Sequence, residues 1–307
     1  MPDQLPDFIA HHRPALEAAL DRWLPLSAQR GAERLNEALR YSVFSGGKRL
    51  RPMLTLIGAR LVGGDTKDAL HAACAVEFLH TSSLILDDLP SMDDADLRRG
   101  RPTLHLVLGE GVAVLAALAL LNQSYALFAL TARQRTGMVE KLIAEAGECI
   151  GSDGMIGGQV ADLELRAANA APDAFASRNL KTTALMRLTM TSGALACGAD
   201  EADARALARF GECLGLAYQA CDDLIDEMGE SALAGKTVGQ DARHLRPTFV
   251  TELGIEGARR LALKLAGEGK AAIIERFGQC YEAQLLAEVL DSVIREVEKF
   301  ELMANAA

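Results

Sequence analysis

The sequence predicts an all-α protein, organised as a single-domain helical bundle. Prolines are absent from two long stretches, residues 103–171 and 248–307, where Ala, Leu, Glu and Arg dominate. These residue types favour helices. Apolar residues also recur at helical spacing, for example between residues 285 and 297. Alternating β-branched runs, which would indicate strands, are nearly absent. These three patterns place the chain in the all-α class.

The predicted helices are separated by short breaks rich in Gly, Pro and Asp. The breaks fall at residues 63–65, 151–158, 171–173, 229–235 and 267–269. They imply roughly ten helices joined by short loops. The chain has no linker-like tract, no low-complexity run and no repeat of solenoid period. We therefore expect one domain over residues 1–307.

The bulk composition excludes several functional classes. A net charge of −10 argues against a general nucleic-acid binder, which needs a basic surface. The N-terminal residues lack the basic start and apolar core of a secretory signal. The six cysteines are scattered and form no C-x-x-C pair. This spacing suits reduced thiols and a cytoplasmic location, not a disulfide framework or a zinc site.

The most apolar stretch of the chain is residues 112–130. It carries Asn122, Gln123 and Ser124 in its second half. Polar side chains at that depth are costly in a bilayer, so the stretch fits a buried core helix better than a membrane span. We expect no stable insertion into a membrane.

An aspartate-rich segment directly follows an apolar run. It contains Asp87, Asp88 and Asp93, and Arg98 and Arg99 come soon after. Carboxylates at the end of a buried helix repel one another unless positive charge lies among them. Mg²⁺ prefers oxygen ligands, often a few carboxylates plus substrate phosphates, and arginines bind phosphate oxygens through forked hydrogen bonds. The segment predicts a metal–diphosphate site; the alternative is a solvated acidic loop neutralised by its arginines.

The spacing within this cluster requires an irregular backbone. On an ideal helix Asp87 and Asp93 would lie roughly 240° apart, so they could not share a face. Pro90 lies between them and removes a backbone donor. We therefore expect the helix to end or bulge there, which could bring the two carboxylates together.

A second carboxylate pair lies far downstream and also follows apolar residues. Asp222 and Asp226 are four residues apart, so they share one face of a helix. One such pair is a weak signal, because surface helices carry similar runs. Two clusters in one helical chain are stronger, and they could face each other across a bundle.

Basic residues lie near both clusters. Lys48, Arg49 and Arg51 follow two glycines, which let a backbone approach an anion closely; the alternative is a surface turn before a helix. His80 lies seven residues before Asp87, on roughly the same helix face. We interpret His80 as a ligand-binding residue on that ground; the alternative is a core histidine that is hydrogen-bonded within the protein.

These segments, in this order, resemble the trans-isoprenyl diphosphate synthases, the family of farnesyl and geranylgeranyl diphosphate synthases. The matching motifs are GGKRLRP (46–52), EFLHT (77–81), DDLPSMD (87–93), RRGRPT (98–103), GGQVADL (157–163), KT (181–182), YQACDDLID (218–226) and GKTVGQD (235–241). So many motifs in one order make the resemblance specific. The spacing of the first cluster is similar to the bacterial and plant geranylgeranyl type.

The resemblance implies a reaction, a fold and a set of site residues. The reaction would join isopentenyl diphosphate to dimethylallyl, geranyl or farnesyl diphosphate, in a bundle around a deep central cavity and usually in a homodimer. Isopentenyl diphosphate would be bound by Lys48, Arg51, His80 and Arg99. About three Mg²⁺ ions around the allylic diphosphate would be held by Asp87, Asp93, Asp222 and Asp226. The remaining cradle would be Arg98, Lys181, Thr182, Gln219 and Lys236, with Asp88 and Asp223 supporting the metal ligands.

The chain departs from the family pattern at several positions. Ala117-Leu118 replaces a Gly-Asp pair, Thr183 a glycine, Arg246 a lysine and Phe249 a tyrosine, and Leu86 stands where histidine is common. Arg246 keeps the charge but not the geometry of lysine. The replacement at Ala117-Leu118 does not indicate an inactive protein.

Three other functions are compatible with parts of this pattern. A class I terpene cyclase uses similar aspartate clusters but does not need the Lys48, Arg51 and His80 site. A non-catalytic partner subunit would be expected to lose one cluster, and both are present.

The third alternative is a farnesyl diphosphate synthase. In the family a bulky aromatic five residues before the first aspartate stops growth at fifteen carbons, and here that residue is Ser82. The resemblance therefore implies the twenty-carbon geranylgeranyl diphosphate as main product, unless Ser82 merely packs against a neighbouring helix.

Overall fold

The computed structural model describes residues 4–132, 135–164, 179–228 and 248–304, and it confirms the all-α prediction. Its helices are α1 (Gln4–Trp23), α2 (Glu33–Val43), α3 (Leu50–Leu61), α4 (Leu70–Asp87), α5 (Leu104–Leu108), α6 (Glu110–Ala132), α7 (Met138–Ile150), α8 (Met155–Glu164), α10 (Leu180–Ala196), α11 (Glu201–Met228), α14 (Phe249–Phe277) and α15 (Tyr281–Ala304). Within the described chain, the strands are confined to a short hairpin of β1 (Leu97–Arg98) and β2 (Arg101–Pro102).

The chain divides into two compact units. Unit 1 comprises residues 1–6, 144–191 and 199–307, and unit 2 comprises residues 7–143 and 192–198. Helices α1, α7 and α10 contribute residues to both units. The expectations of a single domain over 1–307 and of a deep central cavity stay predictions.

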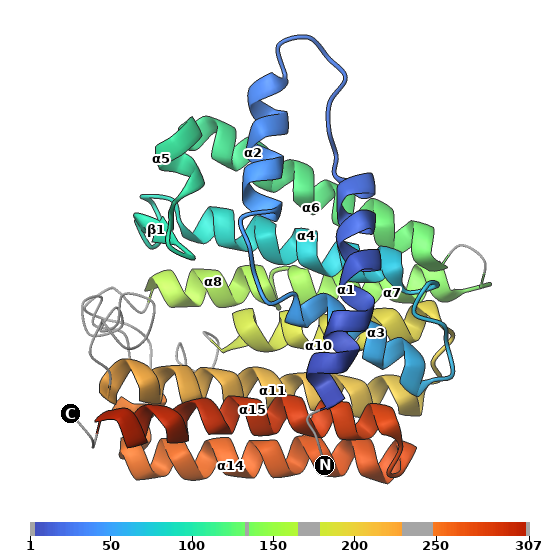
Figure 1. Cartoon of the computed structure of the whole chain (residues 1–307), viewed down its shortest axis with the longest axis vertical. Helices are drawn as coiled ribbons and strands as arrows, with labels where there is room; N and C mark the ends of the chain where they lie inside the picture. The colour runs from blue at the N-terminus through green and yellow to red at the C-terminus, as the bar shows by residue number, and fades with distance from the viewer. Residues whose placement is uncertain (1–3, 133–134, 165–178, 229–247, 305–307) are drawn as a thin grey trace. The chain divides into compact units, whose positions relative to one another are not determined.

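Unit 2 is organised around α4. This helix is apolar on nearly every face and is buried along most of its length. Figure 1 shows α4 and α6 running alongside each other, and α3 also packs against α4. The chain leaves α4 at Asp87 and then forms the β1–β2 hairpin, so the first aspartate cluster lies where the buried helix reaches the surface.

Helix α6 contains the most apolar stretch of the sequence. Ala113, Leu120 and Phe128 are buried, whereas Leu115 and Leu118 are 60% and 51% exposed. The expectation of a buried core helix is therefore confirmed for one face and wrong for the other. By length and composition alone α6 could cross a membrane, a property that it shares with core helices of soluble proteins.

Unit 1 is built on three long helices, α11, α14 and α15, which lie side by side in Figure 1. Most apolar positions of α15 from Leu285 to Val297 are buried, as their helical spacing predicts, and Ile294 is half-buried. The predicted break at residues 267–269 is wrong, because α14 is helical through Phe277. A Cβ at Gly269 would lie 3.1 Å from Leu290 and 3.2 Å from Cys213. Here glycine permits close packing of helices and does not end one.

Candidate active site

The first aspartate cluster forms a tight turn at the end of α4. The helix ends at Asp87, close to Pro90 as predicted, and the chain then folds back. The amide of Asp93 donates to the carbonyl of Asp87 at 2.8 Å, and the amide of Ala95 donates to Asp88 at 3.3 Å. Asp94 takes a left-handed conformation with φ 48° to complete the turn. This turn brings Asp87 and Asp93 together although a continuous helix would separate them.

Asp88 and Arg98 form the charged pair that supports this turn. Asp88 is buried, and Arg98 donates to its Oδ1 from Nε at 3.0 Å and also from Nη2. Burial raises the pKa of Asp88, and the hydrogen bonds and charge of Arg98 oppose that shift. Arg98 is therefore the side chain that holds Asp88 in place. From the sequence, Arg98 is predicted only as a phosphate ligand.

The four residues predicted to bind isopentenyl diphosphate, Lys48, Arg51, His80 and Arg99, lie in unit 2, and two of them contact each other directly. Arg51 and His80 share a hydrogen bond of 3.3 Å between Nη1 and Nε2. Arg99 donates to the carbonyl of Gly46, and a Cβ at Gly47 would lie 2.8 Å from the Arg99 guanidinium. Lys48 follows these glycines directly. The glycine pair therefore lets Arg99 lie against the backbone beside Lys48.

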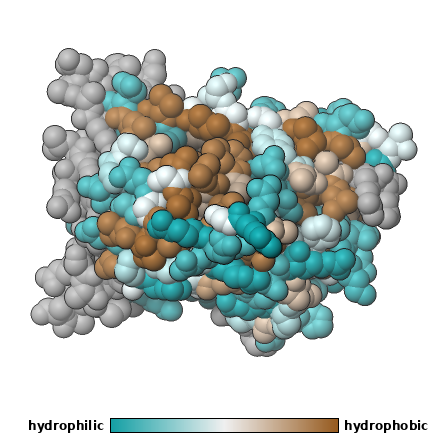
Figure 2. Space-filling model, turned by 90° about the horizontal axis from the view of Figure 1, so that it is seen from above, coloured by the Kyte–Doolittle hydropathy of each residue, from teal (hydrophilic) through white to brown (hydrophobic). Residues whose placement is uncertain are grey.

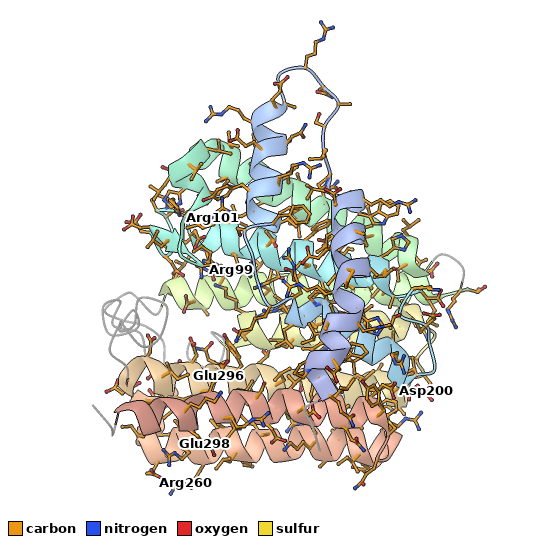
Figure 3. The ribbon with its side chains drawn as sticks, viewed as in Figure 1. Arg99, Arg101, Asp200, Arg260, Glu296 and Glu298 are labelled. Atoms are coloured by element: carbon orange, nitrogen blue, oxygen red, sulfur yellow. The ribbon has the colours of Figure 1, made fainter. Side chains whose placement is uncertain are left out.

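The hairpin that carries Arg99 is held against α2. The hydroxyl of Tyr41 donates to the carbonyl of Pro102 at 2.7 Å, and the Arg101 guanidinium lies 4.3 Å from the centre of the Tyr41 ring. Figure 3 labels Arg99 and Arg101, which come from this hairpin. A pocket of about 40 Å³ beside it is lined by Thr81, Asp88 and Arg99, among others, which is room for a few waters or a small anion.

His80 is neutral at pH 7 in this setting. Burial and then the charge of Arg51 lower its pKa well below 6.5. Its Nε2 can then accept the hydrogen bond from Arg51, which leaves the proton on Nδ1. His80 thus fixes the direction of the Arg51 guanidinium without adding a positive charge.

Arg49 is a structural partner that the sequence interpretation did not assign to the site. Its side chain is 2% exposed and donates to Glu77 at 2.6 Å, to Glu17 at 2.9 and 3.2 Å, and to the carbonyl of Val43 at 2.8 Å. Arg49 also has φ 55° at the start of α3. Glu77 precedes His80 by about one turn of α4. The Arg49–Glu77 and Arg51–His80 contacts therefore form two successive links between α3 and α4.

The second aspartate cluster lies on α11, as its spacing predicts. Asp222 and Asp226 are partly exposed on this helix. Asp223, between them, is buried; it accepts from Gln219 Nε2 at 2.8 Å and from the amide of Phe249 at 2.8 Å. Asp223 therefore orients Gln219 and anchors the first turn of α14. That turn also has a capping box formed by Thr248 and the third residue of the helix.

The remaining predicted site residues divide between α10 and the undescribed part of the chain. Lys181 and Thr182 lie in the first turn of α10, and Gly158 of α8 lies against the Lys181 backbone. Lys236 and Arg246 lie outside the described residues.

Ser82 lies where α4 meets α6. It is 2% exposed, and its hydroxyl donates to the Ala117 carbonyl at 2.8 Å. Ser82 therefore packs against the neighbouring helix, as the alternative interpretation predicts.

The carboxylates suit Mg²⁺ in chemistry. In the part of the chain that the structure describes, no three His, Cys, Asp or Glu side chains gather as a complete metal cage. Mg²⁺ commonly takes only one or two carboxylates from a protein and completes its shell with water and substrate phosphates. Two separate aspartate pairs, Asp87 with Asp93 and Asp222 with Asp226, provide oxygen donors of that kind.

Comparison with known proteins places these features in one family. Residues 32–283 match the polyprenyl synthetase family. The chain is 40% identical to geranylgeranyl pyrophosphate synthase 9, chloroplastic, of Arabidopsis thaliana, over 85% of this chain and 73% of the relative. It is 39% identical to a dimethylallyltranstransferase of Fischerella ambigua (strain UTEX 1903), over 87% and 77%.

Solved structures agree with the sequence relatives. An FPP/GFPP synthase from Zymomonas mobilis superposes with a TM-score of 0.82 at 31% identity, covering 96% of this chain and all of that one. A geranyltransferase from Legionella pneumophila, at 24% identity and a TM-score of 0.81, shares the fold. The chain belongs to the polyprenyl synthetase family.

Proposed function

We propose that this protein is a Mg²⁺-dependent trans-prenyltransferase that joins isopentenyl diphosphate to an allylic diphosphate. The proposal rests on two features along α4. One is a group of basic side chains that can bind a diphosphate directly, and the other is a carboxylate turn that can bind a diphosphate through metal ions. Arg51 contacts His80, the charge of Arg99 also acts on His80, and the carboxylate turn of Asp87 and Asp93 follows at the end of the helix that carries His80. A two-diphosphate reaction needs both a direct cationic site and a metal-mediated one.

The basic residues divide between the two substrates. Lys48, Arg51, His80 and Arg99 bind the diphosphate of isopentenyl diphosphate. Arg98, Lys181, Thr182, Gln219 and Lys236 bind that of the allylic substrate. Bound Mg²⁺, in a cluster of about three ions, supplies positive charge that stabilises the departing diphosphate. Asp87, Asp93, Asp222 and Asp226 are the residues that would hold it.

The chemistry then needs no protein nucleophile. The bond between C1 of the allylic substrate and its diphosphate oxygen breaks, and both electrons leave with diphosphate. The alkene of isopentenyl diphosphate attacks C1, and a proton is lost to form the new double bond, with the released diphosphate as acceptor. The basic residues hold both diphosphates in place, which lowers the entropic cost of the encounter. Apolar walls exclude the water that would quench the allylic cation.

We propose geranylgeranyl diphosphate as the main product. Ser82 is small and lies at the α4–α6 contact, where a growing chain running past the Asp87 turn would meet it. Each further isoprene unit gains from burial, at about 0.8 kcal/mol per CH₂. Relatives named as geranylgeranyl pyrophosphate synthases support this length, whereas the Zymomonas mobilis structure is titled an FPP/GFPP synthase.

An assay with isopentenyl and farnesyl diphosphates separates this function from the alternatives. A prenyl diphosphate five carbons longer than the primer supports prenyl transfer. A hydrocarbon would indicate a terpene cyclase, and no turnover would indicate a non-catalytic partner subunit. If dimethylallyl diphosphate is extended only to fifteen carbons, the protein is a farnesyl diphosphate synthase.

We also propose a homodimer and a cytoplasmic location. Figure 2 shows patches of hydrophobic residues among the hydrophilic ones on the face that it draws. The exposed apolar side chains of unit 2 include Leu106 and Val107 of α5 and Leu115 and Leu118 of α6, and contiguous patches of this kind mark interaction sites. All six cysteines are free, as in a reducing compartment. Light scattering tests the dimer, and Leu115→Glu should shift it toward monomer.

A further inference from the structure

The helices of unit 1 that carry predicted diphosphate ligands touch through glycines. A Cβ at Gly158 of α8 would lie 2.9 Å from the Cα of Lys181 and closer still to its backbone nitrogen. A Cβ at Gly215 of α11 would lie 3.0 Å from the Cα of Thr183. At Gly211 it would lie 2.6 Å from the carbonyl oxygen of Met186. Since these neighbours are backbone atoms, they could not rotate away from an added methyl group.

The contacts define how α10 runs along α11. Gly215 meets Thr183, and Gly211, one turn earlier, meets Met186 and Arg187. The later residues of α10 therefore lie against the earlier residues of α11, so the two helices are antiparallel. Lys181, which precedes Thr183, must then lie beyond Gly215, towards Gln219.

The same face of α11 carries the second aspartate cluster. At about 100° per residue, Gly211, Gly215, Gln219, Asp222 and Asp226 lie within a stripe of about 80°. With a rise of about 1.5 Å per residue, Asp222 lies about 10 Å along the axis from Gly215. The register of α10 on α11 thus determines where the Lys181 ammonium lies relative to Gln219 and Asp222.

We propose that Gly158 and Gly215 are positioning residues that set the place of Lys181 beside the Asp222 face of α11. Gly158 fixes the backbone of Lys181 itself, and Gly215 fixes Thr183, two residues further along the same turn of α10. Replacing either glycine would move the ammonium away from the allylic diphosphate without removing any ligand. This inference rests on the proposed function, because it takes Lys181 as a ligand of that diphosphate.

The chain offers matched controls. Gly147 lies inside α7 and Gly267 inside α14, and a Cβ at either position would meet nothing within 4 Å. Alanine at these positions should be tolerated, since it favours helices more than glycine does. Gly158→Ala and Gly215→Ala make the same chemical change where the space is filled.

The test measures binding of farnesyl thiolodiphosphate, an unreactive allylic analogue, by calorimetry in Mg²⁺. Gly158→Ala should weaken it about tenfold or more, because displacements of about 1 Å in such sites can cost up to 10²-fold. Gly215→Ala should have a smaller effect in the same direction. The control variants and the KM for isopentenyl diphosphate should stay within about twofold of wild type.

A double-mutant cycle then shows whether Gly158 acts through Lys181. In the wild-type background Lys181→Ala should weaken the analogue about tenfold, and in the Gly158→Ala background it should add less than about threefold. If Gly158→Ala does not fold, the cycle with Gly215→Ala decides. If Lys181→Ala weakens binding by the same factor in both backgrounds, the positioning role is overturned. Normal binding of the analogue by both glycine variants also overturns it. Neither result affects the proposal of prenyl transfer. If the wild type neither binds the analogue nor elongates, the proposed function fails, and this inference fails with it.

Discussion

Different contacts position the predicted diphosphate ligands in the two regions. In unit 2, ion pairs and charge-assisted hydrogen bonds position the loop before α3 and the turn after α4: Arg49 with Glu17 and Glu77, and Arg98 with Asp88. In unit 1, glycine contacts set α10 against α8 and α11. A region held by ion pairs should be disrupted when one charged partner is removed. A region held by glycine contacts should be disrupted when side-chain atoms are added at the glycine.

The region held by ion pairs also carries backbone strain. Arg49 and Arg99 both have φ 55°, in the left-handed region. Each such non-glycine residue costs about 1–3 kcal/mol unless its surroundings fix it. The buried hydrogen bonds of Arg49 and the contact of Arg99 with Gly46 provide that fixation.

Removal of Arg49 should have the largest effect on stability. Arg49→Ala leaves Glu77 buried without its partner, which should lower the free energy of unfolding by about 3–5 kcal/mol. Urea unfolding followed by circular dichroism measures this. Arg205→Ala removes an exposed ion pair with Glu201 and should change stability by less than about 1 kcal/mol. Equal effects from the two variants would show that burial of the charge is unimportant.

Both aspartate pairs should be needed for activity but not for folding. Asp87→Ala or Asp222→Ala should lower kcat/KM by a factor on the order of 10² or more, as for other preorganised electrostatic contacts. The melting temperature should change little. Asp21→Ala, which removes an exposed partner of Arg40, is the matched control and should be active. Near-full activity of either variant in limiting Mg²⁺ would refute the assignment of that pair to metal.

The two predicted sets of diphosphate-binding residues should affect the two substrates differently. Arg51→Ala should raise the KM for isopentenyl diphosphate more than that for the allylic primer, and Lys236→Ala should do the reverse. The expected separation is about tenfold, the size of one charge-assisted contact. Steady-state kinetics with each substrate varied in turn measure it. Equal changes in both KM values would rule out this division but not prenyl transfer.

Product length should depend on the space beside Ser82. Ser82→Tyr places a ring where the hydroxyl now contacts Ala117, and it should shift the main product from twenty to fifteen carbons. Ser82→Ala removes the hydrogen bond without adding bulk and should leave the product unchanged. Chromatography of dephosphorylated products gives the chain length. A tyrosine variant that still makes mainly the twenty-carbon product would show that another residue limits growth.

A smaller effect should appear in the pH dependence of stability. Burial lowers the pKa of His80 well below 6.5. Below about pH 6.5 the unfolded chain therefore binds a proton at His80 that the folded protein does not bind. The free energy of unfolding should therefore fall as pH drops below about 6.5. His80→Gln cannot take up that proton, so its stability should fall less between about pH 7.5 and pH 5.5. The same pH dependence in both proteins would contradict the account.

Local chemistry made part of the site predictable from sequence. Pro90 predicts the end of α4, and the four-residue spacing of Asp222 and Asp226 predicts that they share one face of a helix. Such signals act over a few residues. The ion pair of Arg49 with Glu17 spans 32 positions and has no local pattern.

Glycines were the least predictable residues. Gly269 was interpreted as part of a break, yet it lies inside α14 against Cys213 and Leu290. Gly158 was one residue of a family motif, and its contact with Lys181 depends on how two helices pack. A glycine at a turn and a glycine at a helix contact look alike in sequence, because only the tertiary neighbours distinguish them.

The most direct test is elongation by the purified wild-type protein. Farnesyl diphosphate and labelled isopentenyl diphosphate are incubated with Mg²⁺ or with a chelator, and the products are identified by mass spectrometry. We expect geranylgeranyl diphosphate and released diphosphate in equal amounts, and only when Mg²⁺ is present. Turnover that survives chelation, or a hydrocarbon formed from farnesyl diphosphate alone, would contradict this expectation.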